Sequence, residues 1–594
     1  MAERFPNPRG VLEGRAFAPE AWVRAAGEAA PILFAWELAR IPKALDPPVR
    51  RRLHLLISLL LAAQAQGSTR LNLSGSALES LHQAFGEPAV DWAAFLEDPR
   101  LSLLVGGPNS NGPFVLGDGF LTTRRMLAAE QGVAGRIRAL AASPGAQAVV
   151  PDALLEAPIS LTADQRAAVR AALAGRLTLI TGGPGTGKTA LLSALIRALV
   201  ASGLDPEAIA LASPTGKAAQ RMGQSLSSAP VAGLPEPRTL HRLLGWDPRL
   251  RHFRHGAGNP LRIAALVVDE ASMVGLELMD ALLAALPPGA KLVLLGDADQ
   301  LPSVDAGTVF RDLVTGLPQR TFPLTHSHRM DAADPAGRAI LEAARAVGAG
   351  QAPALREAEA AEAPGAPGIA HWPSDDAALR TFLRRWLGQH GRLEEAPFRT
   401  TEAQLEPAET ARLAAIWARL DAGRLLCLLR EGEGLRSSEG LNAFLHLEAQ
   451  REVRPGRSDS PFLPGEPVML HRNDAFRGLF NGDQGVVVRV AREGLPPRME
   501  VAFPRPEGFA FFALDSIQAS LDHAYALTVH KAQGSEYERV ALVLPTQDHP
   551  LLTREILYTA LTRAKRSVAI LGDPALLAIG AARPLQREGG LSLG

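Results

Sequence analysis

The pattern of apolar and polar positions divides the chain into regions of different character. The first 140 or so residues carry apolar side chains at helical spacing, for example Leu53, Leu56 and Ile57, and show no turn-rich strand pattern. We therefore expect a helical N-terminal domain over residues 1–150. A stretch rich in proline and glycine, 141–158, is typical of a linker at its end.

From Leu161 onward, short apolar strands alternate with helical segments, which is typical of a parallel sheet covered by helices. The fold class is therefore α/β, with a first core over 151–325 and a second over 326–594. The expected strands are 177–181, 210–212, 266–268 and 292–295 in the first core, and 425–429, 540–544 and 568–571 in the second.

Residues 464–520 differ from the rest of the second core. Short strands of alternating polarity are expected at 468–470, 485–490, 499–503 and 509–514, with turn sequences at Asn481-Gly482 and Pro496-Pro497. This pattern predicts a small β-barrel inserted into the second α/β core.

Composition and charge exclude several classes of protein. A single cysteine, Cys427, rules out an internal disulfide and a cysteine-rich zinc finger, and fits a reducing cytoplasm. The longest apolar run, Leu55 to Ala63, is too short for a membrane span, so we expect no membrane association. Basic and acidic residues balance at 62 each, so any nucleic-acid site must be a local groove.

The strongest motif is a phosphate-binding loop between an expected strand and an amphipathic helix. Glycines let backbone N–H groups converge on phosphate oxygens, and the helix N-terminus adds positive potential. In this pattern Lys188 reaches the β- and γ-phosphates and Thr189 ligates Mg²⁺, which predicts ATP and Mg²⁺ as cofactors. The loop GGPGTGKT comprises Gly182, Gly183, Pro184, Gly185, Thr186, Gly187, Lys188 and Thr189.

Further candidates lie at the ends of two later strands. Asp269 and Glu270 follow the strand 266–268, where Asp269 would hold Mg²⁺ and Glu270 would orient or deprotonate the attacking water. A helix N-cap followed by a first-turn acid is the alternative, which the upstream phosphate loop disfavours. Gln300 could contact the γ-phosphate. Arginines that complete phosphoryl transfer must come from elsewhere in the chain; no spacing rule picks them out, and the choice of Arg329 and Arg563 rests on the family resemblance given next.

Taken in order, these and further motifs resemble the superfamily-1 DNA helicases of the RecD type over about residues 160 to 573. The resemblance implies two RecA-like cores with ATP between them and single-stranded DNA translocated 5′ to 3′ across both. The motifs are LTADQ (161–165), GGPGTGKT (182–189), SPTGKAA (213–219), TLHRLLG (239–245), DEASMV (269–274), GDADQLPSV (296–304), LTHSHR (324–329), ALTVHKAQGSE (526–536) and YTALTRAK (558–565).

The resemblance also assigns roles to particular residues. Gln165 would contact adenine, and Gly534 and Glu536 would couple the DNA groove to the nucleotide. The inserted barrel would be of the Src-homology-3 type, and a short insertion near 246–262, around 253–258, would take the place of the strand-separating hairpin. The ATPase centre would comprise Lys188, Thr189, Asp269, Glu270, Gln300, Arg329 and Arg563, and the DNA groove Pro214, Thr215, Lys217, His241, Thr528, His530 and Lys531.

Some of these side chains have plainer interpretations. His241 could be a satisfied core histidine, and Thr528 and His530 could simply end a strand. The three tyrosines of the chain all lie near the last motifs, where core packing is favoured over base stacking.

Two forms of the family differ in their N-terminal region: a subunit of the RecBCD helicase–nuclease and a stand-alone helicase with helix-hairpin-helix repeats. GSTRLNL (67–73) and TRRMLAAEQGVA (123–134) look more like the subunit form. We therefore expect a bacterial heterotrimer with RecB-like and RecC-like partners, docked through the N-terminal domain, acting on duplex DNA ends in break repair and recombination.

A nuclease site in this chain is not expected. None of the six lysines has an acid two residues before it, so nuclease activity is expected from the RecB-like partner.

Two hypotheses of other classes make different predictions. A P-loop switch ATPase that never acts on DNA would hydrolyse ATP without stimulation by single strands. An interaction subunit whose motor has decayed is disfavoured, because the motor residues Lys188, Asp269, Glu270 and Arg563 are all present.

Overall fold

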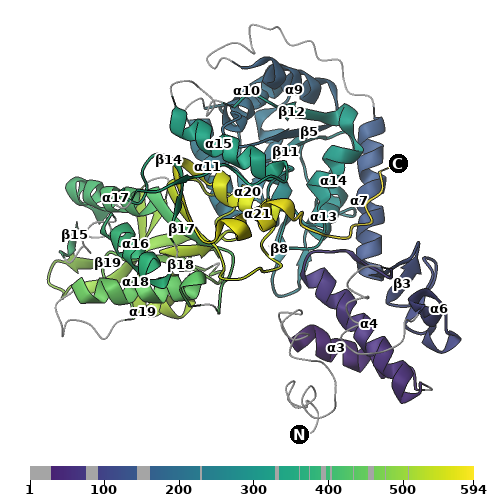
Figure 1. Ribbon diagram of the computed structural model, residues 1–594. Helices are drawn as coiled ribbons and strands as arrows, with labels where there is room; N and C mark the ends of the chain where they lie inside the picture. Colours follow the sequence, from purple (N-terminus) through teal and green to yellow (C-terminus); the bar gives the residue numbers. More distant parts are fainter. Residues whose placement is uncertain are drawn as a thin grey trace.

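The computed structural model describes most of the 594-residue chain (Figure 1). Among the helices of the described residues, none has both the length and the apolar character needed to cross a bilayer. The described residues are 29–43, 45–74, 91–143, 161–227, 230–327, 334–359, 362–373, 375–389, 396–401, 404–432, 434–452, 461–474, 476–505 and 508–593.

The N-terminal region is not purely helical, so that prediction is wrong. Helices α3 (Ala29–Ala39) and α4 (Pro47–Ala65) pack together, but a four-stranded sheet in the order β1-β4-β3-β2 follows them. Its strands are two to four residues long, too short to produce a clear alternation in the sequence. They are β1 (Arg70–Asn72), β2 (Val105–Gly106), β3 (Phe114–Gly117) and β4 (Phe120–Thr123), with helix α6 (Trp92–Leu96) between β1 and β2.

Helix α7 (Arg124–Ala142) belongs with the first core and not with the N-terminal domain. Its buried side chains Val133, Ile137 and Leu140 join the hydrophobic cluster of that core, and Arg136 forms an ion pair with Asp280. The predicted boundary near residue 150 therefore falls too late, and the expected linker lies mostly in 144–160, outside the described residues.

The first core is a six-stranded, entirely parallel sheet in the order β12-β5-β11-β10-β6-β7. Taking its five longer strands in chain order, the arrangement is 5-1-4-3-2. The four predicted strands are all confirmed. The strands are β5 (Leu177–Gly182), β6 (Ile209–Ser213), β7 (Arg238–Thr239), β10 (Ala265–Val268), β11 (Lys291–Gly296) and β12 (Thr321–Leu324).

Helices cover both faces of this sheet, which explains why its strands are apolar throughout. One face packs against α9 (Ala163–Ala174), α10 (Lys188–Ala201) and α11 (Gly216–Ser227). The other packs against α7, α12 (Leu240–Leu244), α13 (Leu276–Ala285) and α14 (Val309–Gly316). The predicted hairpin insertion is present as β8 (Trp246–Asp247) and β9 (His252–Phe253).

The second core repeats this plan with a parallel sheet in the order β13-β14-β25-β24-β17-β23. Helices α15 (Pro335–Gly348), α20 (Arg554–Thr562) and α21 (Pro574–Ala582) cover one face; α16 (Asp376–Gly388) and α18 (Ser438–Glu452) cover the other. The strands are β13 (Arg356–Glu357), β14 (Gly368–Trp372), β17 (Gly423–Cys427), β23 (Ala526–Thr528), β24 (Tyr537–Val543) and β25 (Ala564–Leu571).

The β-rich insertion has the four predicted strands and more. They are β18 (Pro467–Leu470), β19 (Gln484–Arg492), β20 (Arg498–Arg505) and β21 (Gly508–Ala513), joined by β22 (Leu521–His523). The range 464–520 is too narrow, because β15 (Phe398–Thr401) pairs with β19 and leads into β16 (Gln404–Leu405). Helix α17 (Pro407–Ala422) packs on this sheet. The Src-homology-3 comparison stays a prediction.

A buried carboxylate ties the insertion to the second core. Glu466, just before β18, is fully buried and accepts hydrogen bonds from His446 Nδ1 on α18 at 2.7 Å and from His523 Nε2 at 3.1 Å. The Tyr525 hydroxyl and the Leu463 backbone N–H donate to the same carboxylate, at 3.2 and 2.7 Å. A buried charge with four donors is well satisfied, so this cluster fixes how the insertion sits.

After α21 the chain leaves the second core and crosses the first (Figure 1). Arg587 donates to the Ser303 carbonyl at 2.6 Å, and the Glu588 carbonyl accepts from the Thr69 N–H at 2.8 Å. Leu591 and Leu593 pack on the cluster that includes α7. The last residues of the predicted second domain therefore bind to the first core and the N-terminal region.

Candidate nucleotide site

The phosphate loop lies where the sequence places it, between the end of β5 and the start of α10 at Lys188. Gly185 and Gly187 both have φ of +74°, a left-handed conformation that other residues adopt only under strain. The Lys188 ammonium donates to the Gly182 and Gly183 carbonyls, and the Thr186 hydroxyl donates to Gly183 O at 2.8 Å. Strand, turn and helix thus fix a compact cradle of backbone N–H groups.

Two carboxylates follow β10 at the same edge of the sheet. Asp269 Oδ1 accepts from the Glu270 backbone N–H at 2.9 Å, and Glu270 itself has φ of +55°. Burial, together with the neighbouring Glu270 carboxylate, raises the pKa of Asp269 to about 6, although Lys188 opposes the shift. A non-glycine residue in the left-handed region is a constraint that often marks a functional position.

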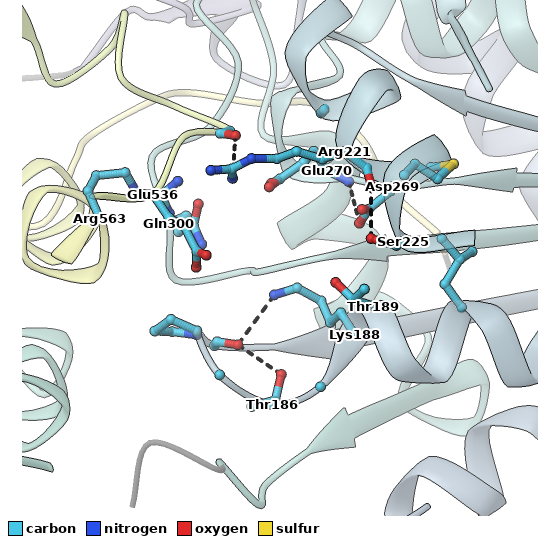
Figure 2. A pocket seen from close by; sticks show the side chains of 18 residues that line it. Thr186, Lys188, Thr189, Arg221, Ser225, Asp269, Glu270, Gln300, Glu536 and Arg563 are labelled. Atoms are coloured by element: carbon cyan, nitrogen blue, oxygen red, sulfur yellow. Dashed lines mark hydrogen bonds between the residues drawn. The ribbon is translucent and has the colours of Figure 1, made fainter. Parts of the chain in front are cut away.

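The second core contributes to this pocket as well. Arg563, just after α20, is buried, and its Nη1 and Nε donate to the Ser535 and Thr559 carbonyls at 3.0 and 3.2 Å. Together with Gly534 and Glu536 it lines the same pocket as Lys188, Thr189, Asp269, Glu270 and Gln300 (Figure 2). The pocket is therefore built from both cores.

The loop after β11 lies between the two cores. Gln300 Nε2 donates to Asp297 Oδ2 at 2.9 Å, and the Tyr558 hydroxyl of the second core donates to the same oxygen at 3.2 Å. The Leu301 N–H donates to the Thr559 hydroxyl at 2.8 Å. The loop, which belongs to the first core, is thereby hydrogen-bonded to the second core.

Two of the predicted nucleotide residues that the structure describes, Gln165 and Gly182, do not line the pocket. Gln165 is buried, caps α9 with Thr162, and donates from Nε2 to Thr186 O at 2.9 Å, so it supports the phosphate loop from behind. Gly182 lies at the end of β5. Arg329 lies outside the described residues. The adenine contact of Gln165 stays a prediction.

Sequence reasoning missed one wall of the pocket, formed by α11. Ala218, Arg221, Met222 and Ser225 line it, as does Leu192 of α10. The signal was present: these α11 positions are spaced by three and four residues and so share one helix face. Only the start of this helix, in SPTGKAA, was singled out from the sequence.

Two of the predicted DNA contacts, Thr215 and Lys217, lie next to residues that line the pocket, Gly534 and Ala218. The loop after β6 lies against the loop after β23. A methyl group added at Gly534 in the second loop would be 3.5 Å from the hydroxyl of Thr215 in the first. Lys217 Nζ is 3.9 Å from Asp421 and 5.5 Å from the Tyr537 ring centroid. Lys531 Nζ is 3.4 Å from Asp522. Pro214 precedes Thr215, and Thr528 ends β23.

The two histidines of the predicted groove have different surroundings. His241 is exposed, so it is not a core histidine, and its ring lies 6.1 Å from Trp246 and 5.7 Å from Phe253 of the hairpin. Burial lowers the pKa of His530 to about 4, and the nearby Arg587 adds to the shift. His530 is thus neutral at physiological pH.

The three tyrosines, Tyr525, Tyr537 and Tyr558, and Cys427 are buried, as expected for residues of the core. Burial also raises the pKa of Cys427 to about 12, so this thiol carries no thiolate chemistry.

A phosphate loop after β5, two carboxylates after β10 and an arginine from a second parallel sheet define a two-lobed P-loop ATPase. The family described as an AAA domain matches residues 165–306, and the family described as a UvrD-like helicase C-terminal domain matches 523–571. These two ranges contain the residues of the two lobes that meet at the pocket.

Relatives extend the match to nearly the whole chain. The RecBCD enzyme subunit RecD of Mycobacterium tuberculosis is 35% identical over 91% of this chain and 91% of its own. The ATP-dependent RecD2 DNA helicase of Deinococcus radiodurans is 35% identical over 80% of this chain and 58% of its own. The chain belongs to the RecD family and is an ATP-dependent DNA helicase of superfamily 1.

Similar solved structures include the Pif1 helicase from Candida albicans. It is 19% identical, covers 70% of this chain and 96% of its own, and has a TM-score of 0.35. Bacteroides Pif1 bound to single-stranded DNA is 17% identical, covers 71% of this chain and 96% of its own, and has a TM-score of 0.34.

Proposed function

We propose that this chain is the 5′-to-3′ motor subunit of a RecBCD-type helicase–nuclease and moves along single-stranded DNA as it hydrolyses ATP. The observation that carries the proposal is a pocket lined both by Arg563 of the second core and by Lys188 and Glu270 of the first. A nucleotide held at such a seam controls how closely the two cores approach, and that movement is what translocation requires.

Each pocket residue has a role in hydrolysis. Lys188 and the N–H groups of the phosphate loop bind the β- and γ-phosphates. Glu270 takes a proton from the attacking water, the bond between the β,γ-bridging oxygen and the γ-phosphorus breaks, and ADP and phosphate leave. Gln300 contacts the γ-phosphate, and Arg563 stabilises the negative charge that develops on that phosphate during transfer.

Mg²⁺ fits the donors at the site. The Thr189 hydroxyl and the Asp269 carboxylate both line the pocket, and hydroxyl and carboxylate oxygens are hard ligands that suit this ion. These two residues would hold it, and the ion would neutralise phosphate charge during transfer.

The groove residues beside the pocket explain how hydrolysis acts on DNA. Hydroxyls and single lysines at loop ends contact phosphates without reading the bases, so binding is tolerant of sequence and weakens with salt. The proposed groove comprises Pro214, Thr215, Lys217, His241, Thr528, His530 and Lys531. Thr215 of this set adjoins Gly534, which also lines the nucleotide pocket.

Assembly with RecB-like and RecC-like partners rests on the relatives. The RecD subunits of M. tuberculosis and Mycolicibacterium smegmatis match this chain over 91% and 90% of their lengths. This chain is also similar to the RecD2 DNA helicase of D. radiodurans, over 58% of the length of that protein. Because of this similarity, a stand-alone helicase is the second candidate function.

Unwinding assays test the proposal directly. The isolated chain and the chain co-purified with its partners are given duplexes with a 5′ or a 3′ single-stranded overhang. We expect ATP-dependent unwinding from the 5′ overhang. Unwinding from 3′ overhangs alone would reject the polarity, and ATP hydrolysis that single strands do not stimulate would favour a switch ATPase.

A further inference from the structure

Arg221 brings a further positive charge into the nucleotide pocket and reaches across to the second core. It lines the pocket with Lys188, Glu270 and Arg563. Its Nη1 donates to the Gly534 carbonyl at 2.9 Å, a hydrogen bond between the two cores. Figure 2 shows the guanidinium beside Glu270, with this bond running toward the loop of the second core.

The helix that carries Arg221 also carries part of the proposed DNA groove. Helix α11 begins at Gly216, directly after Pro214 and Thr215, and Lys217 lies in its first turn. Arg221 follows Lys217 by four residues, so both lie on one side of the helix about 6 Å apart along its axis. A movement of α11 therefore shifts both sites together.

The chemistry of the side chain suits a bridging role. A guanidinium presents five N–H donors in a planar fork, so donation to one carbonyl leaves others for phosphate oxygens. Arg221 lines the pocket together with Thr189 and Asp269. Its positive charge thus acts where the triphosphate and its ligands gather.

We propose that Arg221 binds the γ-phosphate and the Gly534 carbonyl at the same time, so that it reports the state of the nucleotide to the DNA-binding loop 528–536. This inference rests on the proposed function, because it assigns a coupling residue to that motor. When phosphate leaves, Arg221 loses one of its two partners. The loop that carries Thr528, His530 and Lys531 is then held less firmly against the first core.

Thermodynamic linkage provides the test. If Arg221 couples the two sites, its loss must reduce the difference in single-strand affinity between the triphosphate and diphosphate states. We would measure the Kd of a fluorescent oligonucleotide with a non-hydrolysable ATP analogue and with ADP, for the wild-type chain and for Arg221→Gln. We expect the ratio of the two Kd values to fall by about 10-fold in the variant, in the usual range of coupling energies.

Two further variants make the result specific. Arg566→Gln removes an exposed arginine on β25, outside the pocket and the proposed groove, and should keep the wild-type ratio. Arg221→Lys keeps the charge but has no planar fork, so it should give an intermediate ratio and guards against a folding defect in the glutamine variant.

The outcomes separate the two proposals. A wild-type ratio in both Arg221 variants would overturn the role of Arg221 and leave the motor intact. Failure of the wild-type chain to bind single strands, or equal affinities in both nucleotide states, would overturn the motor and the coupling together.

Discussion

The two α/β cores share an architecture but contribute different chemistry. Each is a six-stranded parallel sheet with helices on both faces. Strands β5 and β10 of the first core end in the phosphate loop and in Asp269 and Glu270, whereas the second core supplies Arg563, Gly534 and Glu536 to the same pocket. Under the proposed function, one core would bind the nucleotide and the other would sense it, so that hydrolysis requires both.

Hydrogen bonds and an ion pair join the two cores directly. Leu301, on the loop after β11, donates from its N–H to Thr559 and accepts at its carbonyl from Gln533, at 2.8 and 2.7 Å. Arg311 and Glu555 form an ion pair at 3.2 Å nearby. Leu301, Gln533 and Thr559 lie on three different sequence motifs, 296–304, 526–536 and 558–565.

Among these predictions, removing Arg563, which the second core contributes to the pocket, should have the largest effect on ATP hydrolysis. Arg563→Gln is expected to lower the ATP hydrolysis rate on the order of 10³-fold, because an arginine at the γ-phosphate stabilises transition-state charge. ATP binding should change by only a few-fold, since the phosphate loop is intact. Steady-state hydrolysis and binding of a fluorescent nucleotide measure the two effects. The exposed Arg566 on β25 provides the control variant, Arg566→Gln.

Removing the proton acceptor of the first core should have a somewhat smaller effect. Glu270→Gln is expected to lower the hydrolysis rate about 10²-fold, because general-base catalysis contributes at that scale or above. The variant should still bind ATP. Glu207→Gln, at an exposed site in the same core, should leave the rate unchanged. Equal rates for Glu270→Gln and wild type would assign the base elsewhere.

The second core also differs in carrying an insertion, and Glu466 tests how that insertion is held. Glu466→Gln should lower the free energy of unfolding by about 1–3 kcal/mol at pH 7, because buried donors lose a charged acceptor. Urea denaturation of both proteins measures this. An unchanged midpoint would mean that the insertion is fixed by other contacts.

The same carboxylate predicts a pH dependence. Burial alone raises the pKa of Glu466, but hydrogen bonds from His446 and His523 outweigh it and hold the pKa below its ordinary value of 4.5. Its stabilisation is therefore fully present above about pH 4.5 and is lost as the pH falls through the lower folded value. The difference between wild type and Glu466→Gln should shrink in that acidic range.

The smallest effect should come from a lysine of the first core that binds no nucleotide. Lys291 Nζ donates to the carbonyls of Ala172, Leu173 and Gly175 at 3.2, 2.7 and 2.8 Å, where α9 ends. Lys291→Met should lower the free energy of unfolding by about 1 kcal/mol through loss of these bonds, with ATP hydrolysis unchanged. Thermal unfolding and an ATPase assay check both statements, and a loss of hydrolysis would contradict this structural role.

Local pattern was sufficient for the elements that it dominates. The first-core strands, helix α10 and the four strands 468–470, 485–490, 499–503 and 509–514 follow from apolar runs and turns, and all are confirmed. The short strands β1 to β4 were missed because two to four residues give no period to detect. The pairing of β15 with β19 was missed because the partners are far apart in sequence.

The residues of the nucleotide site also divide into those that a local sequence motif predicts and those that it does not. Lys188 and Asp269 are set by a local motif that forms wherever a strand leads into such a turn. Arg221 was missed, and Gln165 proved to support the phosphate loop, because both depend on which helix packs beside that loop.

The sequence by itself determined the family, the phosphate loop and the two-core plan, because these depend on residue types at fixed spacing along the chain. The tertiary structure alone decided that Arg563 and Arg221 meet in one pocket, and that the chain end after α21 returns to the first core. The physical reason is that such contacts join segments hundreds of residues apart, and their geometry exists only once both sheets have packed.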